Sequence, residues 1–495
     1  MTIDVTGFLG FTGKPEESLF FRGNMGQEIE SSDFTDAELE KFRQQLAEET
    51  SLLETWFDQS LFNKQGYKAG FELEAWLLDS TNHAAPDNDA FLASLNDKNV
   101  VPELATFNFE VNGDAAILAD DVLERMYRDL LKTWRHCADA ASGRDEKILM
   151  IGILPHLRES DLNMDNMSSL SRYKALNRQI LKMRDFKPLH LHINGKDELD
   201  TLKNDVMLEA ATTSFQIHFQ IPMEESVNVF NATLLASAPM VAISANSPYL
   251  FGKDLWDETR IPLFEQSVEI GGPGKRRVSF GYGYLQDTLM ECFAENLAQY
   301  PALLPLVNDS PPEKLAHLKF HNGTIWRWNR PLIDFDKNNK AHLRIEHRVV
   351  PAGPTIRDSF ANAAFYYGLS HGLTLRHEKV SDCIAFDVVK NNFYQCARYG
   401  LNASVIWTDS RELMVRDLII DELVPLATEG LEDLGIDESS IKYWLGIIQG
   451  RAENRQNGAN WQRAWVAKLG HDMQAMVNRY YELQQTEKPV HEWTL

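Results

Sequence analysis

Four separated segments of the chain alternate apolar and polar residues, as half-buried β-strands do. Residues two apart on a strand share one face, so each segment would turn its apolar side chains toward a core and its polar ones away from it. We therefore expect four strands, each with one buried face and one polar face. They cover residues 71–78, 107–112, 215–221 and 342–349.

The polar faces of these strands carry an unusual set of side chains. An ordinary solvated sheet face favours Thr, Ser and Lys, whereas these faces combine acidic residues with one histidine and two arginines. Crowded carboxylates repel one another, which indicates that a cation holds them. Hard divalent cations take oxygen ligands, histidine can join a Mg²⁺ or Mn²⁺ site, and arginines suit phosphate. The residues are Glu72, Glu74, Glu110, Glu346, His218, Arg344 and Arg348, with carboxamides between them.

Two other interpretations of this pattern stay open from the residues alone. The strands could be four unrelated half-exposed segments. Alternatively, the charges could form structural ion pairs, because such networks resemble functional clusters. Glu346 lies between Arg344 and Arg348 on one face of its strand, a spacing that an ion-pair ladder would also show.

Helical periodicity surrounds and follows the strands. Thr35 precedes an amphipathic segment that runs to about residue 61 and is a typical N-cap. From residue 358 onward nearly all of the sequence has a helical pattern, so we expect an α+β protein with a helical C-terminal layer. The expected parts are an irregular segment 1–35, a catalytic α+β domain 36–374 and a helical region 375–495 packed on it. Further helices are expected at 119–142, 170–184, 223–240, 284–300, 410–428, 438–452 and 459–486, and a short strand at 147–155.

Charge and composition narrow the classes of function. A formal net charge of -23 disfavours a nucleic-acid-binding protein, which needs a basic face, and disfavours docking on anionic lipid. The most apolar run, 232–245, is about 14 residues long and contains Pro239, whereas a bilayer span needs about 20. The first residues have no signal-peptide pattern, and the four cysteines form no CxxC pair. We therefore expect a cytoplasmic protein with free thiols.

Three other stretches offer candidate contacts. Arg327 and Arg330, in TIWRWNRP, could contact phosphates or a substrate carboxylate, or could extend to solvent while the neighbouring tryptophans pack in a core. Arg172 and Tyr173 could bind an amino-acid substrate, although the tyrosine could equally pack at a helix start. The glycine-rich stretch 271–277 looks like a phosphate loop but lacks a Ser or Thr after its lysine, so a turn is the default.

Several motifs match a known family and keep its order from about residue 70 to 358. The most specific are ANSPYLFGKD and GTIWRWNRP, supported by GFELEAWLLD, FEVNGD, SRYKALNRQI, TSFQIHFQI and LRIEHRVVPAGPTIRD. On these motifs the chain resembles the glutamate–cysteine ligase type 2 group of carboxylate–amine ligases, which share the glutamine synthetase catalytic fold. The helical tail from about residue 375 has no counterpart among these motifs.

The resemblance implies a curved antiparallel sheet that forms a funnel, glutamine synthetase-like and flanked by helices. ATP would enter at one end and amino-acid substrates at the other, with Mg²⁺ (or Mn²⁺) ions between them. The implied metal ligands are Glu72, Glu74, His218, Glu346 and Glu110; Arg348 and Glu346 would be catalytic, and Arg330, Arg327 and Arg344 would bind the nucleotide.

The expected reaction joins a carboxylate to an amine through an acyl phosphate, with ATP as co-substrate and amino acids as partners. Glutamate–cysteine ligase activity, which forms γ-glutamylcysteine in glutathione biosynthesis, is one option within this class. Two alternatives stay open: a guanidino-type phosphotransferase of the same fold, for which we identify no reactive cysteine, and a non-catalytic nucleotide-binding protein. A homo-oligomer is compatible with the sequence, and we expect no nucleic-acid or membrane partner.

Overall fold

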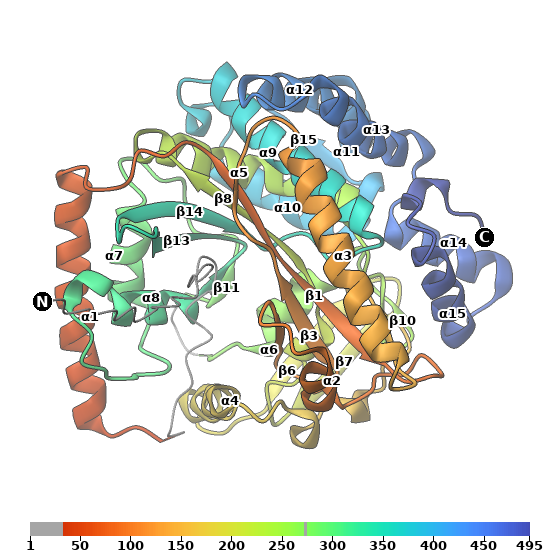
Figure 1. Cartoon of the computed structure of the whole chain (residues 1–495), viewed down its shortest axis with the longest axis horizontal. Helices are drawn as coiled ribbons and strands as arrows, with labels where there is room; N and C mark the ends of the chain where they lie inside the picture. Colours follow the sequence, from red (N-terminus) through yellow and green to blue (C-terminus); the bar gives the residue numbers. More distant parts are fainter. Residues whose placement is uncertain (1–32, 272–274) are drawn as a thin grey trace, which may run out of the picture.

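The computed structural model describes residues 33–271 and 275–495 (Figure 1). The expected irregular segment 1–35 lies outside the described residues apart from its last three, and so does the middle of the glycine-rich stretch, residues 272–274. The described part is an α+β structure in which helices surround a curled antiparallel sheet, as predicted.

The central sheet contains all four predicted strands as consecutive neighbours. Its order is β13-β14-β8-β1-β3-β2, with β4 and β5 pairing with β1 off this path, and every pairing is antiparallel. Figure 1 shows the sheet curling between β14 and β3 rather than lying flat. The bounds are β1 Lys68–Leu78, β2 Val100–Pro102, β3 Asn108–Asn112, β4 Ala116–Ile117, β5 Lys147–Leu149, β8 Phe215–Ile221, β13 Asn329–Phe335 and β14 Ala341–His347.

The register of these strands sets polar side chains in rows across one face. Directly opposed residues on antiparallel strands have Cβ atoms about 4.5–5.5 Å apart, so each opposed pair is close enough to interact. The opposed polar pairs are Arg330 with Glu346, Glu346 with His218, Glu72 with Gln216 and Glu74 with Glu110.

Helix α9 (Ile356–Arg376) covers the apolar face of the sheet. Phe360 of α9 packs against Phe71 of β1, with ring centroids 5.5 Å apart. Farther along α9, the Tyr367 hydroxyl bonds to the carbonyls of Gly70 at 3.1 Å and His218 at 3.0 Å. The helix is therefore fastened to the backbone of the strands whose opposite face is polar.

The first described helix, α1 (Asp36–Asp58), begins where the sequence predicts. Thr35 accepts a hydrogen bond from the Glu38 amide, and the Glu38 carboxylate accepts one from the Thr35 amide, which forms a capping box. The helix then packs against α7 and α8. Its buried Glu49 accepts a hydrogen bond from the Leu318 amide at 2.7 Å and lies 2.6 Å from His317 Nδ1, so this carboxylate serves the packing of α8.

The C-terminal region differs from the prediction in two places. Residues 404–414 contain a small hairpin, so the helix expected over 410–428 begins at Val415. Gly470, with φ 99°, separates two helices where a single helix was expected over 459–486, because a positive φ interrupts a helix and suits glycine.

The remaining small pairs are β6 Leu189–Asn194 with β7 Glu198–Lys203, β9 Tyr249–Leu250 with β10 Lys253–Asp254, β11 Val278–Ser279 with β12 Trp326–Arg327, and β15 Ser404–Ile406 with β16 Glu412–Met414. The other helices are α2 Asn88–Leu95, α3 Val122–Ser142, α4 Ser171–Met183, α5 Ser226–Ser244, α6 Arg260–Ser267, α7 Met290–Gln299, α8 Ala316–Gly323, α10 Phe386–Tyr399, α11 Val415–Leu418, α12 Val424–Asp433, α13 Glu438–Asn454, α14 Gly458–Leu469 and α15 Met473–Gln484.

Helix α5 is longer than the apolar run at 232–245. Together with the turn before it, Met223–Ser244 comprises 22 residues, and its most apolar 18-residue window has a mean hydropathy of 1.4. The segment is long and apolar enough to cross a membrane by length and composition. The helix thus continues beyond the run of about 14 residues on which the sequence-based expectation rested. The fold buries 89% of its most apolar window, and α5 packs against α9 and α10, as a core helix does.

A buried ion pair fastens the C-terminal helices to α9. Arg451 of α13 lies 2.8 Å from Asp358 of α9, and both side chains are at most 1% exposed. Arg451 also donates to Asn362 at 2.6 Å, and the Val490 amide donates to the same Asp358 carboxylate at 3.2 Å. One carboxylate thus joins α9, α13 and the end of the chain.

Arg451→Met should lower the free energy of unfolding by about 3–5 kcal/mol, because it leaves the buried Asp358 carboxylate without its cation. Urea denaturation followed by circular dichroism measures this change. As a control, Arg376→Met, which breaks an exposed pair with Glu429, should leave the urea midpoint nearly unchanged. Equal midpoints for the two variants would contradict the assignment.

Candidate active site

Three side chains from three neighbouring strands converge on the polar face. Glu72 of β1, His218 of β8 and Glu346 of β14 are buried, and their ligand atoms lie within 4.8 Å of one another. His218 Nε2 is 3.5 Å from Glu72 Oε1 and 3.7 Å from Glu346 Oε1. We call these three residues the first cluster. The structure thus brings together three of the predicted metal ligands.

Arginines surround Glu346. Arg330 of β13 holds it with two bonds, Nε to Oε2 at 2.7 Å and Nη2 to Oε1 at 2.9 Å. Arg348 Nη1 lies 3.0 Å from Glu346 Oε2. Arg344 points toward Asp334, with a closest separation of 3.6 Å between charged atoms. Arg330 was expected at the nucleotide, and its observed partner is a carboxylate of the first cluster.

The pKa values of the first cluster separate its two carboxyls. Burial and the charge of Glu346 raise the pKa of Glu72 to about 8. Burial would also favour the neutral form of Glu346, but Arg330 and Arg348 outweigh it and hold the Glu346 pKa below its usual value. Burial, aided by Arg344, lowers the pKa of His218 to about 3. The imidazole is therefore neutral near pH 7 and keeps a lone pair for a metal ion.

A second cluster lies beside the first and contains Glu74, Glu103 and Glu110. Their ligand atoms also lie within 4.8 Å of one another, and all three side chains are partly buried. Burial and Glu74 raise the pKa of Glu103 to about 7, and burial and Glu72 raise that of Glu110. Both shifts are the effect first of burial and then of carboxyls that lie close together.

Glu103 was not predicted, and its local sequence explains why. It follows β2, which has only three residues and no alternation that marks a strand. The residue reaches the cluster because β2 pairs with β3 beside Glu110. Its only signal in the sequence is an acidic residue after a short apolar run, which is too common to identify a site.

Gln216 connects the two clusters. Its Nε2 donates to Glu74 Oε1 at 2.8 Å, and its Oε1 accepts a hydrogen bond from Arg348 Nη1. The Ser214 amide donates to the other oxygen of Glu74 at 2.7 Å. Glu72 and Glu74 were both expected as metal ligands, and the structure places them in different clusters, with Gln216 and Arg348 between.

Arg327 lies apart from both clusters. Its guanidinium bonds to Asn296 at 2.7 Å and Glu295 at 3.1 Å, both on α7, and its strand β12 pairs with β11 outside the central sheet. The expected contact of Arg327 with the nucleotide stays a prediction.

Arg172 and Tyr173, at the start of α4, border the second cluster. The Arg172 guanidinium lies 3.1 Å from the Tyr173 hydroxyl. Burial and Glu103 raise the pKa of Tyr173, while Arg172 opposes the rise in the pKa of Glu103. Arg172 and Tyr173 therefore lie close enough to the Glu103 carboxyl to interact with it electrostatically.

The chemistry of the donors fits hard divalent cations. The first cluster offers carboxylate oxygens and one neutral imidazole, and the second offers carboxylate oxygens alone, which are the ligands that Mg²⁺ and Mn²⁺ accept. Burial and neighbouring carboxyls raise the pKa values of Glu72, Glu103 and Glu110, and a divalent cation bound among them would favour their ionised forms.

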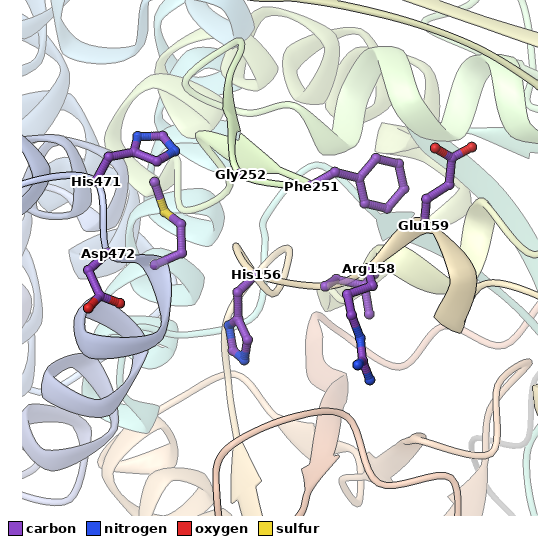
Figure 2. Close-up of a pocket in the computed structure, with 9 residues that line it drawn as sticks. His156, Arg158, Glu159, Phe251, Gly252, His471 and Asp472 are labelled. Carbon is purple, nitrogen blue, oxygen red and sulfur yellow. The ribbon is translucent and has the colours of Figure 1, made fainter.

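A surface hollow of about 720 Å³ lies elsewhere, between the loop 156–159, the turn at Phe251 and the start of α15. Figure 2 shows the charged ends of Arg158 and Glu159 pointing in opposite directions rather than converging. Glu159 bonds to Thr201 at 2.6 Å. None of the residues that line this hollow belongs to either cluster, so it is not the candidate site.

Comparison with known proteins gives a family match over most of the chain. The chain matches the glutamate–cysteine ligase family 2 (GCS2) over residues 68–477. The match extends past residue 375, so the expectation that the helical tail has no counterpart is wrong for most of its length. None of the curated proteins matches the chain in sequence.

Two solved structures share the fold. The glutamate–cysteine ligase of Francisella tularensis, in complex with AMP, is 12% identical with a TM-score of 0.57, and the alignment covers 86% of this chain and 90% of that one. A bifunctional glutathione synthetase from Pasteurella multocida is 11% identical with a TM-score of 0.51, covering 88% of this chain and 55% of that one. The family match spans well over half of the sequence, and the chain therefore belongs to glutamate–cysteine ligase family 2.

Proposed function

We propose that the protein is an ATP- and Mg²⁺-dependent carboxylate–amine ligase whose reaction takes place on the polar face of the central sheet. The observation that carries the proposal is the convergence of Glu72, His218 and Glu346 beside Arg348. Membership of the family supports the reaction class, and the AMP bound to the Francisella tularensis structure supports a nucleotide site in this fold.

Glu72, His218 and Glu346 would hold one divalent ion, and Glu74 with its neighbours in the second cluster would hold another. Such ions, when bound, neutralise charge on phosphoryl oxygens. The chain itself supplies the rest. Arg330 keeps Glu346 ionised and oriented, and Arg348 offers a cation beside the same carboxylate, where it would contact the transferring phosphoryl group.

In the proposed reaction a substrate carboxylate oxygen attacks the γ-phosphorus of ATP, the bond to the bridging oxygen breaks, and ADP leaves. The amine nitrogen then attacks the acyl carbon of the acyl phosphate, inorganic phosphate leaves and the nitrogen loses a proton. Arg348 remains protonated throughout, because Glu346 outweighs burial and raises its pKa. It can therefore stabilise charge on the phosphoryl oxygens in both steps.

We propose glutamate and cysteine as the substrates, on the strength of the family. Arg172 beside the second cluster is a suitable partner for a substrate carboxylate, because a guanidinium binds a carboxylate with two parallel bonds. We further propose that residues 36–374 form the catalytic unit and that 375–495 pack on it as its support. Cytoplasmic location and a homo-oligomeric state remain predictions.

No observation favours the phosphotransferase alternative. A kinase of the guanidino type would use a reactive thiolate, whereas the thiol pKa values of Cys137, Cys292, Cys383 and Cys396 are all raised, in each case chiefly by burial. A non-catalytic protein would bind Mg-ATP without turnover, which the following assay distinguishes.

ADP release from ATP should require Mg²⁺, glutamate and an amine-bearing amino acid together. A coupled ADP assay across amino-acid pairs measures it, with cysteine expected as the best partner. Glu346→Gln should lower kcat by about 10²–10³, since it removes a charge that acts on the metal and on Arg348. Glu49→Gln, which alters a buried carboxylate of α1 that bonds to α8 and belongs to neither cluster, should retain activity. If no pair stimulates turnover, the ligase assignment fails.

Arg348→Lys should lower kcat by about 10² or more while the KM for ATP changes little. Lysine keeps the charge but loses the planar guanidinium, whose Nη1 donates to both Glu346 and Gln216. Steady-state kinetics over a range of ATP concentrations measure both constants. A raised KM with an unchanged kcat would mean that Arg348 contributes only to ground-state binding.

Without metal, the protein should become less stable as pH rises from about 6 to 9. The folded pKa values of Glu72 and Glu103, about 8 and about 7, exceed the ordinary value of 4.5, so the folded state binds more protons than the unfolded state in this range. Stability is then lost as pH rises through the folded values. Thermal unfolding in EDTA measures the loss.

Mg²⁺ with a non-hydrolysable ATP analogue should reduce this dependence, because the ions bind the deprotonated carboxylates. The gain in unfolding temperature should be larger at pH 8.5 than at pH 6.5. The double variant Glu72→Gln with Glu103→Gln should weaken both the pH dependence and the effect of Mg²⁺. The same pH dependence with and without Mg²⁺ would contradict metal binding at these carboxyls.

A further inference from the structure

A buried arginine outside both clusters holds the backbone that carries Arg348. Arg260, the first residue of α6, is 3% exposed and pairs with Glu258 through Nη1 at 3.0 Å. The same guanidinium donates from Nη1 to the Val349 carbonyl and from Nη2 to the Arg348 carbonyl, each at 3.2 Å. One side chain thus binds two consecutive carbonyl groups.

These carbonyls lie where the strand ladder has ended. Strand β14 and its regular pairing with β8 end at His347. On one side of the two carbonyls the Arg348 amide donates to the Trp328 carbonyl at 2.9 Å, and on the other the Val350 carbonyl accepts from the Phe215 amide at 2.9 Å. Between these two backbone bonds, Arg260 supplies the hydrogen-bond donors for the Arg348 and Val349 carbonyls. A buried carbonyl without a donor would lower the stability of the fold.

Glu258 is itself held from two sides. It is fully buried, and one of its oxygens accepts a hydrogen bond from the Asn246 amide at 2.8 Å. Its own amide donates to the Ala397 carbonyl at 2.9 Å, in the C-terminal region. The Asn246 side chain bonds in turn to Tyr480 at 2.9 Å and Gln462 at 3.0 Å. The ion pair therefore connects the helical region after residue 375 with the end of β14.

The packing around Arg260 leaves little room for adjustment. A Cβ added at Gly152 would meet Arg260 Cδ at 3.1 Å and Pro351 Cβ at 2.9 Å. The arginine stem thus lies in a closely filled space next to the segment that follows Arg348. A shift of its guanidinium would move the two carbonyls rather than be absorbed by neighbouring voids.

We propose that Arg260, oriented by Glu258, is a positioning residue that fixes the backbone of Arg348 and so aims its guanidinium at Glu346 and the phosphoryl site. The inference rests on the proposed function for its kinetic consequence, whereas its structural consequence can be measured without any substrate. Misplacing a catalytic group by about 1 Å can cost about 10²-fold in rate. The Glu258–Arg260 pair would therefore control turnover without touching a substrate.

The competing explanation is that the pair only stabilises the core. Arg451 provides a matched comparison, because it is an equally buried arginine in an ion pair, with Asp358, and donates to a backbone carbonyl of α9. It makes no contact with β14. Loss of stability alone should affect Arg260 and Arg451 variants in the same way, whereas loss of positioning should affect Arg260 alone.

The test compares the full-length wild type with Arg260→Lys, Glu258→Gln and Arg451→Lys. Lysine keeps the charge but cannot bind both carbonyls and Glu258 with the arginine geometry. Glu258→Gln keeps the shape and frees the guanidinium, and carries the test if Arg260→Lys does not fold. The measurements are kcat and KM for ATP in the ADP assay, and hydrogen–deuterium exchange of the peptide 343–352 in the absence of substrates.

We expect Arg260→Lys and Glu258→Gln to lower kcat by about 10–100-fold with little change in KM for ATP, and to speed exchange in the 343–352 peptide. Arg451→Lys should leave kcat and this peptide unchanged. Wild-type exchange rates in both Arg260 and Glu258 variants, or equal losses of kcat in the Arg451 control, would overturn the proposal. If the wild type releases no ADP, the proposed function fails, and the exchange measurement still decides the positioning.

Discussion

Negative charge gathered on one face of the sheet is the constraint on which the rest of the structure depends. Glu72 and Glu346 approach His218 from adjacent strands where little water enters, and burial alone would favour neutral acids. Arg330 and Arg348 keep Glu346 ionised, whereas the pKa of Glu72 rises to about 8. The arginines therefore supply part of the positive charge that balances these carboxyls. A divalent cation would supply the rest.

Such a face is useful only if its strands cannot move apart. The opposite face provides this rigidity, because Tyr367 of α9 bonds to the backbone of both β1 and β8 directly behind the first cluster. The Asp358–Arg451 pair then secures α9 to the C-terminal helices. Figure 1 shows α12 and α13 lying against α9, and α14 with α15 at the C-terminal end of the molecule. The C-terminal helices thus help to hold α9, and through it the sheet, in place.

Local pattern was enough to identify most of the central sheet. Alternation with a period of two marks strands by itself, because it reflects only the direction of successive side chains. Four strands and their polar faces follow from it, and with them Glu72, His218 and Glu346 as candidates on one surface. The capping box at Thr35 and Glu38 is equally local and placed the start of α1 correctly.

Tertiary structure alone decided how these side chains combine. Strand order and register place Glu103 beside Glu74, divide the predicted ligands into two clusters and pair Arg330 with Glu346. Arg327 lies on a strand that pairs outside the central sheet, and its guanidinium bonds to α7 instead. The sequence determined which faces are polar and which residues could bind a cation. It could not determine their partners, because pairing depends on contacts between segments far apart in the chain, and each segment's own pattern is the same whichever strand lies beside it.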